Sequence, residues 1–202
     1  MPMKKLTLSC LVLVAACGGR PPAPAGLPAL ACGLAQREIS VAADARARPY
    51  GLREHLAKNF GDGRVSWLMR DADYQKYVVA TSATRWGRCN EAGCFTFAAP
   101  AALIHEAVAR ASHDGAHAAG ELGAALGLPA RNFEGPLVMM TLDLDEGGVC
   151  ARLPVDADPG VWPCKTADDR DCFKFGGYTS GGVPELMLVD APVARTAITP
   201  VP

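Results

Sequence analysis

The chain has 202 residues, of which half are apolar and one fifth are charged, and its formal net charge is −1. This length and composition indicate one globular domain with a substantial apolar core. Nucleic-acid-binding domains usually carry a strongly basic balance, so a near-neutral chain excludes nucleic acid as an expected partner.

The first residues are typical of an exported protein. Lys4 and Lys5 precede an apolar run of about 11 residues from Leu6 to Ala16. A membrane-spanning helix needs roughly 20 apolar residues, so this run is too short for a permanent anchor. A charged start followed by a short apolar run instead predicts a cleavable signal peptide over residues 1–16.

Small residues lead from this run into Cys17, which Gly18 follows. The segment resembles the lipobox of bacterial lipoproteins, in which the matching cysteine is acylated on sulfur and becomes the new N-terminus. The resemblance implies a lipid anchor at Cys17 and a location in the bacterial cell envelope, and Gly18 favours the outer membrane. An ordinary secretory signal with an incidental cysteine is the alternative.

The mature chain divides by composition into three parts. Residues 17–31 are rich in Gly, Pro and Ala and predict an extended tether. The globular domain is expected over 32–190. Residues 191–202 contain several prolines and predict a loose C-terminal tail.

Apolar spacing and turn residues predict the elements of the first half of the domain. A helix is expected at 50–60, where Leu52, Leu56 and Phe60 share one face and glycines follow. Asp71, Ala72 and Asp73 form a short connection that predicts a hairpin. The expected strands are 37–42, 64–70, 74–82 and 94–98.

The second half of the domain is predicted to contain a helical region followed by strands. A helical region is expected over 100–128, where Pro100 suits a first turn and a second helix covers 116–126. Strands are expected at 137–144, 149–153, 173–175 and 185–189. Strands on both sides of a helical insert predict an α+β fold with a mainly antiparallel sheet.

Six cysteines remain after Cys10 and Cys17 are set aside, and an even number outside the cytosol predicts disulfide bonds. Cys89 and Cys94 enclose the turn-forming tetrapeptide Asn-Glu-Ala-Gly and are the first expected pair. For the remainder we favour Cys164 with Cys172 and Cys32 with Cys150, and the other pairings stay open. Zinc binding is the alternative, but no C-x2-C pair occurs.

His113, His117 and Glu121 are spaced four residues apart. On one continuous helix they would share a face, and two imidazoles with a carboxylate can hold a catalytic zinc ion. Gly115 and Gly120 weaken such a helix by about 1 kcal/mol each relative to Ala. Surface histidines are therefore the alternative to a zinc-dependent hydrolase.

The most glycine-dense stretch of the mature chain covers residues 176–182. Glycine allows close approach of the backbone to a ligand, and free N–H groups with hydroxyls can bind an anion. Gly177, Tyr178 and Thr179 are therefore candidate ligand-binding residues, and Ser180 is a candidate catalytic residue. A wide turn before the last strand is the alternative.

An arginine on an early strand, Arg64 or Arg70, precedes a hydroxyl-rich segment at 81–84, and Glu185 follows the glycine stretch. This order is similar to the arginine–serine–glutamate order of ADP-ribosyltransferase-type toxin domains, although a Ser-Thr-Ser motif is absent. The resemblance implies NAD as the substrate, Arg70 as a ligand of its phosphates, and Glu185 as the residue that stabilises an oxocarbenium-like transition state.

No complete set of catalytic residues is visible in the sequence. The main hypothesis is therefore a lipid-anchored envelope domain that binds a protein or a small molecule and needs no cofactor. The alternatives are an NAD-using enzyme with Glu185 as its acidic residue and a zinc hydrolase that uses the His113 group.

Overall fold

The computed structural model describes residues 30–47, 51–113, 115–145, 149–155, 158–161, 165–166, 173–174 and 176–202. The signal peptide, Cys17 and the proposed Cys164–Cys172 pair lie outside these residues. Among the described helices, none combines the length and the apolar character that crossing a membrane requires.

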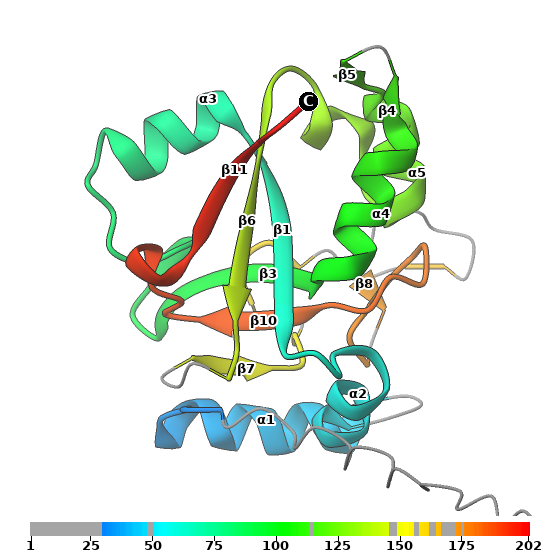
Figure 1. The fold of residues 1–202 in the computed structure, drawn as a ribbon. Helices are drawn as coiled ribbons and strands as arrows, with labels where there is room; N and C mark the ends of the chain where they lie inside the picture. Colours follow the sequence, from blue (N-terminus) through cyan, green and yellow to red (C-terminus); the bar gives the residue numbers. More distant parts are fainter. Residues whose placement is uncertain are drawn as a thin grey trace, which may run out of the picture.

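The fold is α+β, as predicted, and its centre is a seven-stranded antiparallel sheet. Figure 1 shows two groups of strands that run in different directions, β1 and β6 along one axis and β3 and β10 across it. The first group contains β1 (Arg64–Arg70), β6 (Leu137–Asp143) and β11 (Ala197–Val201). The second group contains β2 (Arg88–Asn90), β3 (Gly93–Pro100), β7 (Cys150–Arg152) and β10 (Leu186–Val189).

The two groups are joined by a short pairing between β1 and β3. Only Val65 with Pro100 and Ser66 with Ala99 are partners. In contrast, β1 pairs with β6 along all seven of its residues. The end of β1 and the beginning of β3 therefore diverge, and each follows its own group of strands.

Helices cover the sheet on several sides (Figure 1). The helices α4 (Ala101–Ala111) and α5 (Ala119–Leu126) pack apolar side chains such as Ile104 and Leu122 against one face of the β1–β6 group. The remaining helical elements are α1 (Leu34–Arg46), α2 (Leu52–Asn59), α3 (Asp71–Tyr74), the π-helix η1 (Gln75–Val79), and the 3-10 turns η2 (Ala130–Phe133) and η3 (Val193–Arg195). Two small hairpins pair β4 (Ser112–His113) with β5 (Ala116–His117), and β8 (Phe173–Lys174) with β9 (Tyr178–Thr179).

The prediction of strands at 37–42 and 74–82 is wrong, because both segments are helical. In α1 the buried residues Gln36 and Ala43 lie seven positions apart, which is two helical turns. Tyr74 and Val78, four positions apart, pack against the main core. Helical spacing of the buried side chains thus overrides the β-favouring composition, and the hairpin expected at residues 71–73 is the start of α3.

The prediction of a loose tail at 191–202 is also wrong, because β11 pairs with β6 over five residues. Trp86, which is fully buried, donates from Nε1 to Thr196 Oγ1 over 2.7 Å and ties this segment to the core. Pro200 is compatible with β11 because the strand lies at the sheet edge, where a missing N–H leaves no neighbour unsatisfied.

Two of the predicted disulfides are confirmed. Cys89 and Cys94 are direct partners in the β2–β3 hairpin, so their bond closes the hairpin. The Cys32–Cys150 bond joins the segment that leads into α1 to β7, across 118 positions of sequence. Both bonds connect segments that the sheet or the core already places together.

Candidate functional site

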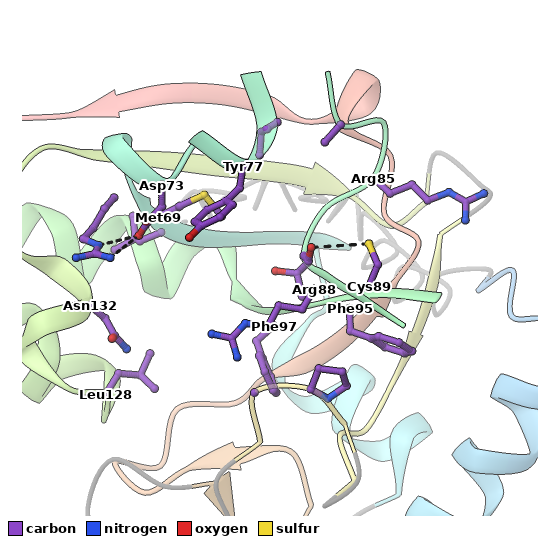
Figure 2. A pocket seen from close by; sticks show the side chains of 18 of the residues that line it. Met69, Asp73, Tyr77, Arg85, Arg88, Cys89, Phe95, Phe97, Leu128 and Asn132 are labelled. Carbon is purple, nitrogen blue, oxygen red and sulfur yellow. Dashed lines mark hydrogen bonds and ion pairs between the residues drawn. The ribbon is translucent and has the colours of Figure 1, made fainter. Parts of the chain in front are cut away.

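A pocket of about 940 Å³ lies where β1 and β3 diverge. Continuing the register of Ser66 with Ala99 would pair Leu68 with Phe97, but Phe97 pairs with β10 and both residues line the pocket. Figure 2 shows further wall residues, with Tyr77 contributed by η1 and Leu128 by the loop after α5. The volume is at the upper end of the range for small-molecule sites, roughly 300–1,000 Å³.

Glu185 brings a carboxyl group to this largely apolar pocket. It stands one residue before β10, on the same side of the strand as Met187, and Met187 pairs with the wall residue Phe97. The residue is only 8% exposed, and within the described part of the chain its carboxyl group has no hydrogen-bond or ion-pair partner. Burial raises the pKa of Glu185 to about 8, so the group is mainly protonated at neutral pH.

The backbone of Glu185 is held from both sides. Its N–H donates to Gly177 O over 2.7 Å, and its carbonyl oxygen lies 3.2 Å from His55 Nε2. His55 is fully buried in α2, and Asn59 Nδ2 lies 3.2 Å from its Nδ1. Burial lowers the pKa of His55 to about 4, so the imidazole is neutral, donates from Nε2 and accepts at Nδ1.

Sequence reasoning missed His55 altogether. The apolar pattern of Leu52, Leu56 and Phe60 predicted the helix but gave no function to the residue beside Leu56. The partner of His55 is a backbone carbonyl 130 positions away, which no local pattern can reveal. His55 is therefore a positioning residue for the backbone of Glu185 and has no place in the pocket lining.

Three arginines line the pocket, and they differ in their partners. Arg70 forms an ion pair with Asp73 at 2.7 Å, and Arg85 pairs with Asp190 at 2.9 Å. Arg88 has no acidic partner among the described residues. Figure 2 shows Arg88 reaching from β2 into the space bounded by Phe97, Leu128 and Asn132, whereas Arg85 extends away from it.

The position of Arg88 depends on a close backbone contact. Gly87 has a φ of +97°, and a Cβ atom there would lie 1.8 Å from Phe95 O. Only glycine fits this approach, which brings the chain onto β3 and pairs Arg88 with Phe95. The following Cys89–Cys94 bond closes the same hairpin, so the arginine stands on a rigid support.

The glycine stretch brings only one of its candidate residues to the pocket, and that residue is Thr179. Tyr178 lies away from it and accepts a hydrogen bond on its hydroxyl from Asn59 Nδ2 over 3.0 Å. Ser180 Oγ lies 3.4 Å from Gly127 O at the end of α5, so the candidate catalytic serine also lies outside the lining.

Close packing explains the glycines themselves. A Cβ atom on Gly177 would lie 2.9 Å from His55 Nε2 and 3.0 Å from Glu185 O. A Cβ atom on Gly181 would lie 2.7 Å from the Cα of Gly127. The stretch is thus a tight turn that supports Glu185 and packs on α5.

The candidate zinc ligands do not form a ligand set. His113 and His117 lie in the β4–β5 hairpin, because the chain turns there and α5 begins only at Ala119. His117 Nε2 lies 2.9 Å from Phe133 O and its Nδ1 3.1 Å from Pro202 O, while His113 Nε2 is 3.3 Å from Glu121 Oε2. No group of three or more His, Cys, Asp or Glu side chains in the described residues could hold a metal ion.

Comparison of the chain with protein-family models, curated proteins and solved structures found no match.

The protonation of Glu185 predicts a specific pH dependence of stability. The unfolded chain releases the proton near pH 4.5 and the folded chain only near pH 8, so the free energy of unfolding falls as the pH rises between these values. One pH unit corresponds to about 1.4 kcal/mol, so this loss is on the order of 5 kcal/mol at most. Glu185→Gln cannot titrate and should not show this loss. Measured by urea unfolding, its free energy of unfolding should therefore rise relative to that of the wild type as the pH is raised from about 5 to about 8.5.

Glu134→Gln is the matched control, because Glu134 is exposed and forms no ion pair among the described residues. This variant should keep the pH dependence of the wild type. The same pH dependence in Glu185→Gln and in the wild type would show that the Glu185 carboxyl group is not held protonated by the fold.

Proposed function

We propose that this chain is a lipid-anchored domain of the cell envelope that binds a small organic molecule in the pocket beside Glu185. One observation carries the proposal, namely a buried carboxyl group without a described partner that lies on the lining of a large pocket. The carboxyl oxygens of Glu185 are not among the fully buried, unpaired side-chain atoms of the described residues, so they keep access to the pocket. A ligand in the pocket can therefore hydrogen-bond to this group.

The rest of the lining has the composition of a ligand site. Its walls are mainly apolar, and the side chains of Arg88, Thr96 and Asn132 have no hydrogen-bond partner in the described part of the protein. An apolar cavity with a few convergent polar groups is the usual form of a small-molecule site. Paired strands support Arg88 and Thr96, and the Cys89–Cys94 bond closes the hairpin that carries Arg88.

The envelope location rests on the first 19 residues and agrees with the chemistry of the domain. The described residues contain two disulfides, Cys32–Cys150 and Cys89–Cys94. Such bonds persist mainly in oxidising compartments outside the cytosol. An exported domain held by a lipid at Cys17 would meet this condition.

A fragment screen by ligand-observed NMR tests the binding function. Fragments of mixed charge should bind the wild type, and Asn132→Trp should weaken their binding at least tenfold by filling the pocket mouth. Arg131→Trp is the matched control, because Arg131 is the exposed neighbour in η2 and does not line the pocket. Equal binding by Asn132→Trp and the wild type would place the fragments elsewhere and contradict the proposal.

Catalysis with NAD is the second candidate, and the burial of Glu185 in a pocket beside arginines favours it. If this candidate is correct, the purified protein should release nicotinamide from NAD. The rate of release should fall about a hundredfold or more in Glu185→Gln. Glu121→Gln should retain the activity. A wild-type rate no higher than that of buffer removes this candidate.

The anchor is tested in the bacterial cell with an alkyne-tagged fatty acid. The wild type should incorporate the label, and Cys17→Ala should lose it because the sulfur is the acylation site. Cys10→Ala is the matched control and should stay labelled, since Cys10 belongs to the segment that is removed. An unlabelled wild type, or a label that survives in Cys17→Ala, would contradict the anchor.

A further inference from the structure

The charges around the pocket narrow the class of ligand, and this step rests on the binding function proposed above. The acidic residues on the lining are Asp73 and Glu185. Asp73 is already paired with Arg70, and Arg85 is paired with Asp190. Arg88 is therefore the one lining cation that lacks a counter-charge among the described residues.

Glu185 does not supply that counter-charge. Its burial raises the pKa to about 8, so at neutral pH it offers a neutral carboxyl group and not an anion. The nearest titratable side chain on α2, His55, contacts the carbonyl oxygen of Glu185 and is neutral as well. The pocket consequently has an excess of positive charge at Arg88.

The support of Arg88 suits recognition of a fixed anionic group. Gly87 and the Cys89–Cys94 bond hold the backbone on either side of it. A guanidinium group presents donors in a planar fork that matches a carboxylate or phosphate, and charge-assisted bonds of this kind are about twice as strong as neutral ones.

The pocket walls next to Arg88 include apolar side chains, which favour a ligand with an apolar organic part. Phe97 and Leu128 border the space that Arg88 enters (Figure 2), and Leu68 lines the same pocket from β1. A bare inorganic anion would leave these side chains in contact with water. Burial of a small aromatic ring against them would stabilise the complex by removing apolar area from water.

We propose that the pocket binds an organic anion, with a carboxylate or phosphate group on the guanidinium of Arg88 and an apolar body against Leu68, Phe97 and Leu128. Glu185 lies on the same lining and provides a hydrogen bond to a polar atom of the ligand body. The site thus selects a charged group and an apolar body within one molecule.

Isothermal titration of the intact purified protein with four probes tests this assignment. Benzoate and phenyl phosphate should bind at least tenfold more tightly than neutral benzamide, and the affinity for both anions should fall as NaCl is raised. Phenyl phosphate should also bind at least tenfold more tightly than inorganic phosphate. Arg88→Gln should weaken both anions at least tenfold, whereas Arg131→Gln, with the same change of charge nearby, should stay within twofold.

Each part of the assignment has its own contradicting result. Equal affinity for benzamide and benzoate, or full anion binding by Arg88→Gln, overturns the choice of an anion. Equal affinity for inorganic and phenyl phosphate overturns the apolar body. Because Arg88 is exposed, Arg88→Gln should unfold at the wild-type temperature, and Arg88→Lys should restore part of the affinity if the charge is the cause.

The outcome is distinguishable from failure of the binding function itself. If the anions do not bind but other fragments do, and Asn132→Trp still blocks those fragments, only the ligand class is wrong. If no probe or fragment binds in a way that Asn132→Trp weakens, both the binding function and the ligand class are wrong.

Discussion

The two-residue pairing between β1 and β3 is the constraint on which the rest of the structure depends. A continuous sheet would bring Leu68 opposite Phe97 and would fill the space between them. Each strand instead follows its own partner, β1 with β6 and β3 with β10. On the other face, the ring of Trp67 packs edge-to-face on the buried Trp86 at 5.4 Å, so the core stays closed while the opposite face opens. The pocket is therefore a consequence of strand pairing.

The same divergence determines the state of Glu185. The residue lines the pocket between the two groups of strands, is only 8% exposed, and forms no ion pair with a described residue. His55 is buried as well, with its Nε2 beside the carbonyl oxygen of Glu185. Burial raises the pKa of the acid and lowers that of the base. Both groups are thus neutral, and Arg88 remains the lining cation without an acidic partner among the described residues.

Sequence patterns predicted the features that depend on residues close together in the chain. The α+β class, the Cys89–Cys94 bond and most strands followed from periodicity, turns and cysteine spacing, whereas Cys32–Cys150 was only the pair that remained and spans 118 positions. The segment 74–82 was misassigned because Val and Tyr favour strands, whereas its burial follows a helical spacing set by contact with Trp86. β11 was missed because its partner β6 lies about 60 residues earlier in the chain. Arg88 was missed for a similar reason, since its exposure to the pocket depends on the contact between Gly87 and β3.

Binding and catalysis make opposite demands on Glu185. Stabilising an oxocarbenium-like charge requires a carboxylate, yet the fold keeps the group protonated near neutral pH. A cationic group placed next to Glu185 would lower its pKa and could ionise it, so catalysis would depend on the positive charge of its substrate. An organic anion at Arg88 has no such requirement, because a neutral Glu185 adds no negative charge to the pocket. The proposed binding of an anion therefore agrees with a neutral Glu185, whereas the proposed catalysis needs the group ionised.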